Sequence, residues 1–275
     1  MARKHIEYIQ SQQLAWRSCE WSYPGAAVDV KVLSQDVHSG ACSVLLRLPA
    51  GWHCPLRALS VDEELLVLEG ALTLGDCDLA QDCYAWVPAG TSREAMISAE
   101  GAVILAFYSG TPLAGTALPD SQPRVLDAFA MPWSSEGMDP AYGDAGMRWK
   151  ILRHDPETED VSMLVMAPPH LVPPDWSGPQ EQHDCFEEAF VIAGDFLSPI
   201  GIMRAGAYFW RPPHILHGPY GTRGGNLSFI RTLGGVLENN WTDQEVRLNR
   251  SPEFSADLPP TVVGELKDYD PPAPY

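Results

Sequence analysis

The sequence predicts an all-β protein made of two similar units in tandem. Its apolar segments have strand length rather than helix length, and they are rich in β-branched and aromatic residues. The 25 prolines and 23 glycines of the 275-residue chain bound many of these segments. A pattern of residues also recurs along the chain at a nearly constant spacing. Together these three observations favour many short strands over helices.

The expected strands occur in both halves of the chain. In order they lie within residues 42–51, 64–75, 83–90, 102–110, 162–169, 188–195, 207–213 and 227–235. The segment of residues 5–17 could add an edge strand to the partner repeat or to another subunit, and the sequence leaves both open. Residues 251–275 are rich in proline, so we expect a tail that is extended over the surface.

Two pairs of segments define the internal repeat. VDEELLVLEG matches CFEEAFVIAG, and CYAWVPAG matches AYFWRPPH, in each case 124 residues further along the chain. Upstream, residues 31–49 match residues 150–168 at a spacing of 119, so the second copy has five extra residues in the loop that contains PPHLVPPDW. The repeat predicts two domains, residues 1–120 and 121–275, with a boundary near residues 119–137.

Composition limits the classes of partner. The chain has 18 basic and 36 acidic residues and a net charge of −18, which argues against binding to nucleic acid or to anionic membranes. Neither a signal peptide nor a run of roughly 20 apolar residues is present, and we expect a soluble cytoplasmic protein. The six cysteines form no C-x-x-C pair, which predicts reduced and mostly buried thiols.

The second copy carries a recognisable arrangement of acidic residues, histidines and glycines. It reads Glu181-x-His183-x-x-x-Glu187, then six residues and a glycine, and later Gly206, five residues, Pro212-x-His214-x-x-His217. This arrangement resembles the two motifs of the cupin superfamily, and residues 29–240 as a whole resemble a bacterial bicupin. The resemblance implies two tandem jelly-roll barrels.

The same resemblance implies a metal site in the second barrel, formed by Glu181, His183, Glu187 and His217. Cupins usually have histidine at the position of Glu181, but a carboxylate can replace imidazole as a ligand of a divalent ion. Iron(II) is favoured, with manganese(II), zinc(II) or nickel(II) as alternatives. Strand alternation turns Gln182 away from the site, and Asp184 and Glu188 are expected to point outward into solvent. The alternative is a vestigial barrel in which Glu181 caps the mouth.

The first copy departs further from the cupin motifs. Arg57, Leu59, Glu63 and Arg93 occupy the four ligand positions. A guanidinium remains protonated and cannot ligate a cation, so we expect no metal in this copy. Glu63 is expected to pair with Arg57 or Arg93 inside the barrel instead. His53 is expected on the surface.

Other residues of the second copy are weaker candidates. His214 occupies the glycine position of the motif and is a candidate for proton transfer, although a turn histidine without a role is equally compatible. Arg231 lies in an apolar strand and is a candidate for orienting an anionic group of the substrate, because such a cation demands a carboxylate partner or an anionic ligand unless it faces outward. Trp176, Tyr208 and Trp210 are candidate substrate contacts, although core or rim packing is the commoner role of such residues.

The resemblance implies a metal-dependent enzyme, most simply an oxygenase that acts on a small carbonyl or phenolic compound. A non-oxidative isomerase or lyase, a sensor or storage protein that binds a small molecule, and an epimerase-like barrel without metal are the alternatives. The expected partner is a small-molecule substrate, and a homodimer is left open.

Overall fold

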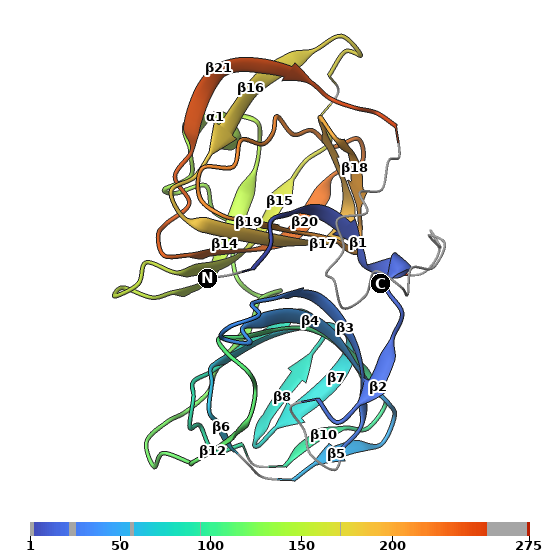
Figure 1. Cartoon of the computed structure of the whole chain (residues 1–275), viewed down its shortest axis with the longest axis vertical. Coiled ribbons are helices and arrows are strands. Elements are labelled where there is room, and N and C mark those ends of the chain that lie inside the picture. Colours follow the sequence, from blue (N-terminus) through green and yellow to red (C-terminus); the bar gives the residue numbers. More distant parts are fainter. Residues whose placement is uncertain (1–2, 22–25, 56–57, 94, 171, 252–273) are drawn as a thin grey trace. The chain divides into compact units, whose positions relative to one another are not determined.

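The computed structural model describes residues 3–21, 26–55, 58–93, 95–170, 172–251 and 274–275 (Figure 1). These residues are almost entirely β-structure, which confirms the predicted all-β fold. The expected extended tail lies outside the described residues, apart from its ends. The chain divides into two compact units, residues 1–4 with 15–131 and residues 5–14 with 132–275, here named barrel 1 and barrel 2.

Barrel 1 is built around one large antiparallel sheet. Its strands are β2 (Arg17–Cys19), β3 (Val28–Gln35), β4 (Cys42–Leu48), β5 (Trp52–Cys54), β6 (Ala58–Leu59), β7 (Glu63–Leu74), β8 (Cys77–Ala80), β9 (Cys83–Val87), β10 (Met96–Ser98), β11 (Ala102–Tyr108), β12 (Ala114–Gly115) and β13 (Arg124–Asp127). The sheet order is β13-β9-β7-β11-β4-β3-β2, with β8 and β10 paired to β7, β5 paired to β10, and β6 paired to β12. Apolar side chains from these strands, among them Leu46, Trp52, Leu65 and Met96, pack together in one core cluster.

Barrel 2 repeats this arrangement with additional elements. Its elements are β1 (Ile6–Gln10), the 3-10 turn η1 (Ser11–Gln13), α1 (Pro140–Asp144), β14 (Arg148–His154), β15 (Val161–Ala167), β16 (Ser177–Gln182), β17 (Phe186–Ser198), β18 (Gly201–Arg204), β19 (Ala207–Arg211), β20 (Asn226–Leu233) and β21 (Asn240–Arg247). The main sheet has the order β1-β19-β17-β20-β15-β14. The pair β16 and β21 forms a second layer, and α1 lies beside it (Figure 1).

The first strand of the chain belongs to barrel 2. Ile6 of β1 is opposite Trp210 and Ile9 is opposite Tyr208 on β19, so β1 completes the sheet edge that β13 occupies beside β9 in barrel 1. The sequence-based division at residue 120 therefore differs from the observed units at two strands. It left β1 with the first copy and β13 with the second, because hydrogen bonding across the sheet is not visible in the order of the chain.

The glycines of the repeat have a structural cause. Gly70 and Gly194 have φ angles of +72° and +80°, a region that residues with a side chain rarely adopt. A Cβ atom at Gly70 would lie 2.1 Å from the carbonyl oxygen of Gly101, and one at Gly194 would lie 1.9 Å from that of Gly225. The two contacts are equivalent in the repeat, so each barrel needs a glycine where its long strand passes the neighbouring turn.

A buried hydrogen bond explains a second repeated pair. The hydroxyl of Tyr84 donates to Glu64 at 3.0 Å, and the hydroxyl of Tyr208 donates to Glu188 at 2.7 Å. Glu188 also accepts from Arg231 at 2.7 Å, and its side chain is buried. The expectation that Glu188 is solvated is therefore wrong, because alternation fixes the side of a strand but not what covers that side. Asp184 is exposed, as expected.

The remaining general expectations have mixed outcomes. All six cysteines are free thiols; three are buried, two are partly buried, and Cys19 is exposed. His53 is exposed, as expected. Among the described residues, no helix is long and apolar enough to cross a membrane.

Replacement of Gly194 with alanine is expected to destabilise barrel 2 by about 2–4 kcal/mol, because it combines a left-handed backbone with a clash against Gly225. Gly224→Ala is the matched control, since a Cβ atom there meets nothing within 4 Å. Urea unfolding of both variants measures the difference. Equal stabilities would show that the close approach at Gly194 is not a constraint.

Candidate metal centre

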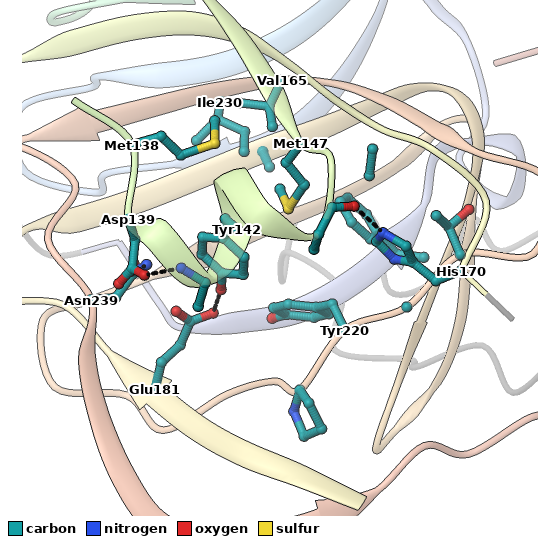
Figure 2. Close-up of a pocket in the computed structure, with 18 of the residues that line it drawn as sticks. Met138, Asp139, Tyr142, Met147, Val165, His170, Glu181, Tyr220, Ile230 and Asn239 are labelled. Carbon is teal, nitrogen blue, oxygen red and sulfur yellow. Dashed lines mark hydrogen bonds between the residues drawn. The ribbon is translucent and has the colours of Figure 1, made fainter. Parts of the chain in front are cut away.

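Barrel 2 encloses a cavity of about 590 Å³. Its wall is mostly apolar and includes aromatic and methionine side chains from the main sheet and from α1 and its neighbouring loops, among them Met138, Met147, Trp149, Val165, Phe196, Met203, Phe209 and Ile230. Three ionisable side chains of the motif, Glu181, His183 and Glu187, also line it. Figure 2 shows Tyr142 on α1 joined to Glu181 by a hydrogen bond at the cavity wall.

Two backbone contacts bring the motif histidines together. The backbone amides and carbonyls of Glu181 and His217 exchange two hydrogen bonds of 3.0 Å, which tie the end of β16 to the loop after β19. The amide of His214 donates to the carbonyl of His183 at 2.9 Å in the same region. The two segments of the motif are therefore joined like neighbouring strands, which places His217 beside His183 and Glu181 of the cavity wall.

The two imidazole rings face each other through their Nε2 atoms. Nδ1 of His183 lies 2.8 Å from the carbonyl oxygen of Glu238, and Nδ1 of His217 lies 2.8 Å from that of Ile215. A carbonyl can only accept, so both Nδ1 atoms carry hydrogen and the neutral rings present lone pairs at Nε2. The two Nε2 atoms are 3.1 Å apart. Two lone pairs at this separation repel each other unless a proton or a metal ion lies between them.

The N···N separation fits a shared metal ion. Two nitrogen ligands at roughly 2.1 Å from one ion and a right angle apart are about 3.0 Å from each other. Histidines that bind a metal also commonly donate a hydrogen bond from the second ring nitrogen to a carbonyl, and both rings do so here. Among the described residues, Glu181, His183 and His217 form a group whose possible ligand atoms all lie within 4.8 Å of one another.

Both glutamates of the motif lie beside the imidazoles. Oε1 of Glu181 is 3.8 Å from Nε2 of His217. Oε2 of Glu187 is 3.8 Å from Nε2 of His183 and 3.7 Å from that of His217. The structure thus places the four predicted ligands around one space, with Glu187 slightly outside the closest group of three.

The environment sets different pKa values for these groups. Burial raises the pKa of Glu181 to about 7, although the hydrogen bond from Tyr142 opposes this shift. Burial also acts on Glu187, but the nearby His183, His217 and Arg211 outweigh it and hold its pKa below the usual value. Burial, assisted by the charge of Arg211, lowers the pKa of His217 to about 3. Its ring is therefore neutral at physiological pH and can act as a ligand.

Arg211 fixes the position of Glu187. Its Nη1 atom is 3.3 Å from Oε2 of Glu187, and its Nη2 atom is 3.3 Å from Oε1 of Glu7 on β1. The guanidinium also lies over the ring of Phe209, 3.7 Å from its centroid. A buried carboxylate held in this way keeps one orientation toward the histidines. The first strand of the chain thereby takes part in positioning the site.

Helix α1 contributes a residue that the motif did not indicate. The hydroxyl of Tyr142 donates to Oε1 of Glu181, and its ring packs edge-on against Trp241 with centroids 5.4 Å apart. Asp139 caps the helix by accepting from the amide of Ala141 at 2.8 Å, and it also accepts from the indole of Trp241 at 2.8 Å. These contacts attach α1 to β21 and hold Tyr142 at the site (Figure 2).

The structure separates the remaining candidate residues from the cavity, with one exception. The side chain of His214 is 66% exposed, and its Nδ1 atom lies 3.4 Å from Oδ1 of Asp184. This position on the surface corrects the prediction that His214 transfers protons at the site. Arg231 pairs with Glu188, which is the carboxylate partner that its position demands. Arg231 is therefore not an anion-binding group of the cavity. Tyr208 and Trp210 are buried outside the cavity lining, and Trp210 stacks on Phe186.

Trp176 lines the cavity, and it packs against the cluster of Leu197, Ile202 and Leu248. Of the three aromatic candidates for substrate contact, it is the one that the described structure places on the cavity wall. The corrections for Tyr208 and Trp210 share one reason. Their strand β19 alternates, so Phe209 and Arg211 face the site while residues 208 and 210 face away.

Sequence reasoning missed Arg211, Tyr142 and Tyr220. The argument applied to Arg231, a cation inside an apolar strand, applies equally to Arg211 and would have identified it. Tyr142 lies in a segment without a counterpart in the repeat, so no comparison between copies could reveal it. Tyr220 follows the second motif closely, but a tyrosine next to proline carries no specific signal.

In barrel 1, other residues occupy most of the positions that correspond to the four candidate ligands of barrel 2. Glu63 and Arg93 form a buried ion pair, which confirms one of the two pairings predicted for Glu63. The other, with Arg57, lies outside the described residues. Leu59 is buried in the core. A guanidinium therefore stands in barrel 1 where an imidazole stands in barrel 2.

Comparisons with solved structures agree with this architecture. The chain is similar to a Nostoc punctiforme PCC 73102 protein described as a "putative dioxygenase", with a TM-score of 0.76 and 19% identity over 88% of this chain and 92% of that chain. It is also similar to Ylba from E. coli, with a TM-score of 0.57 and 12% identity over 86% and 94% of the two chains. A third structure is Bacillus subtilis oxalate decarboxylase, which has Mn(II) centres, with a TM-score of 0.52 and 12% identity over 89% and 80%.

These likenesses show the fold, two tandem jelly-roll barrels of the cupin type. The chain belongs to the family of the domain of unknown function DUF4437, whose family model matches residues 7–239. A search of curated proteins finds no match.

Replacement of His217 with alanine is expected to abolish stoichiometric metal binding and leave the fold largely intact, because the ring's Nε2 atom is lost while the backbone contacts to Glu181 remain. His214→Ala is the matched control and should keep its metal, since His214 lies on the surface. Elemental analysis of the purified proteins gives the metal content. Full occupancy in the His217 variant would remove this residue from the site.

Replacement of Arg93 with alanine is expected to destabilise barrel 1 by about 3–5 kcal/mol, because Glu63 keeps a buried charge without its partner. Metal content should not change. The double variant Glu63→Leu with Arg93→Leu tests the cause and should be more stable than the single variant in thermal unfolding. A single variant as stable as the wild type would contradict the buried pair.

Proposed function

We propose that barrel 2 is the active site of a metal-dependent enzyme that transforms a small organic substrate, with oxygenase chemistry on a carbonyl or phenolic compound as the leading reaction. One observation carries the proposal. Two buried imidazoles, with their Nε2 atoms 3.1 Å apart and two glutamates beside them, lie at a cavity of about 590 Å³ that His183, Glu181 and Glu187 line. This volume lies within the range of roughly 300–1,000 Å³ typical of small-molecule sites.

His183, His217, Glu181 and Glu187 would hold the ion. When bound, the ion supplies a Lewis acid, and in the case of iron(II) also a redox centre, next to the substrate. Imidazole and carboxylate ligands suit iron(II), manganese(II) and zinc(II), and iron(II) is the ion that we favour. Two carboxylates nearly neutralise a divalent charge, which disfavours a hydrolase that depends on strongly acidified water.

The protein's own residues orient and enclose this centre. The carbonyls of Glu238 and Ile215 fix the imidazole tautomers, and Arg211 fixes Glu187. Tyr142 holds its proton at the phenolic oxygen and donates it in a hydrogen bond to Glu181. The apolar wall excludes water from the reacting groups and binds the hydrocarbon part of a substrate.

The comparisons support this proposal at the level of the fold. Structures similar in fold to this chain include one described as a "putative dioxygenase" and one with Mn(II) centres, both at less than 25% identity. They make oxygenase chemistry the first reaction to test, and they do not extend to substrate or metal identity.

A non-oxidative isomerase or lyase is the second candidate. In this candidate Glu181 does not ligate the ion. Its hydrogen bond with Tyr142 favours the candidate, because a phenol and a carboxylate with a pKa of about 7 form a pair able to exchange protons with a bound substrate. Oxygen uptake separates the two candidates, since proton transfer alone consumes no oxygen. A sensor or storage protein would bind a ligand without converting it.

Removal of the metal with a chelator is expected to abolish turnover, and reloading with iron(II) is expected to restore it. The measurement is oxygen uptake together with substrate loss over a panel of phenols and diketones. The His217→Ala variant is the matched control and should stay inactive after reloading. Undiminished turnover by the chelated protein would contradict the proposal, whereas metal-dependent substrate loss without oxygen uptake would favour the isomerase or lyase.

A further inference from the structure

Tyr220 places a hydroxyl group inside the cavity. Its side chain lines the wall, and its hydroxyl oxygen is buried without a hydrogen-bond partner among the described residues. Figure 2 shows this end of the ring turned toward Tyr142 and Glu181. A buried hydroxyl without a partner costs about 1–3 kcal/mol, which a phenylalanine at the same position would avoid. The group is therefore placed where a bound molecule can pair with it.

The ring of Tyr220 is held firmly. Its centroid lies 5.5 Å from that of Phe196 and 6.0 Å from that of His217, and the Arg211 guanidinium lies 5.7 Å from it. Aromatic and cationic neighbours at these distances favour one ring orientation. The ring of Tyr220 thus lies beside His217, with its hydroxyl held in one preferred direction.

The rest of the wall restricts the charge of a bound molecule. Among the described residues that line the cavity there is no lysine or arginine. Arg211, which lies behind Glu187, already engages two carboxylates. The lining carboxylates Glu181 and Glu187 balance a divalent ion, so a carboxylate or phosphate would find no free positive charge. A neutral molecule meets no such penalty.

The wall also favours a flat apolar body. Trp149, Phe209 and Trp241 contribute aromatic side chains to the lining, and Met138, Met147 and Met203 contribute adaptable thioethers. Methionine sulfur and aromatic rings both make favourable contacts with aromatic ligands.

We infer that the Tyr220 hydroxyl donates a hydrogen bond to the phenolic or carbonyl oxygen of a neutral aromatic substrate, and so directs that oxygen to the metal centre. This inference rests on the proposed function, because it names the substrate class of the same cavity. Tyr220 is a substrate-binding residue in this arrangement, and it selects for an oxygen atom on an otherwise apolar molecule.

The test uses two probes of nearly equal shape, 2-naphthol and 2-methylnaphthalene, with the full-length protein loaded with redox-inactive zinc(II). Affinities are measured by titration for the wild type, Tyr220→Phe and Tyr208→Phe. The Tyr208 variant loses a buried hydroxyl that bonds to Glu188 outside the cavity, and it controls for destabilisation. Zinc content and the unfolding midpoint are measured on the same samples.

We expect Tyr220→Phe to weaken the binding of 2-naphthol about three- to tenfold, which is the effect of one hydrogen bond. The affinity for 2-methylnaphthalene should change less than about twofold. Tyr208→Phe should change neither affinity. Equal losses for both probes, unchanged 2-naphthol binding, or failure of the wild type to bind 2-naphthol would each overturn the inference. Absence of zinc would instead contradict the proposed metal centre, so the two failures are distinguishable.

Discussion

The site depends on the repulsion between two imidazole rings whose Nε2 atoms are 3.1 Å apart. Nδ1 of each ring donates a hydrogen bond to a backbone carbonyl. A change of tautomer would break that bond, so it cannot relieve the repulsion between the Nε2 atoms. A proton or a divalent metal ion between the two nitrogens would remove this repulsion. Two glutamates lie beside them, which favours an ion of higher charge than a single proton.

Much of barrel 2 serves to maintain this arrangement. The strand-like contact between Glu181 and His217 sets the separation of the two motif segments. Arg211 and Glu7 orient Glu187, and Tyr142 orients Glu181. The groups come from both ends of the barrel's sequence, including the first strand and a helix that the repeat lacks. The site is therefore a property of the whole unit rather than of the motif alone.

Barrel 1 shows what the same scaffold does with different residues. Arg93 is the counterpart of His217, and its guanidinium neutralises Glu63, the counterpart of Glu187. An arginine side chain thus supplies a positive charge beside Glu63, at the position that His217 occupies beside Glu187. The repeated glycines and the tyrosine to glutamate hydrogen bonds are shared, because they belong to the strand geometry and not to the chemistry.

The sequence predicted the features that follow from residue spacing. Segment length, composition and the repeat predicted the all-β fold, and the resemblance to the cupin motifs grouped Glu181, His183, Glu187 and His217 as ligands. Spacing could not show that β1 joins barrel 2, since sheet pairing acts across the whole chain. It also could not show that Glu188 is covered by Tyr208 and Arg231, because alternation does not reveal what packs on a strand face.

Tyr142 and Tyr220 lay beyond sequence reasoning for a related reason. Each reaches the cavity from a loop or a short helix, where no periodicity fixes the direction of a side chain. Their roles became visible only through the atoms that they face.

Anomalous diffraction from crystals of the metal-loaded protein tests the central claim most directly. The account predicts one anomalous peak in barrel 2, within bonding distance of Nε2 of both His183 and His217 and of a carboxylate oxygen of Glu181 or Glu187. Crystals of protein soaked with iron(II), manganese(II) or zinc(II) that show no peak between the two rings would indicate a shared proton instead, and would contradict the metal centre.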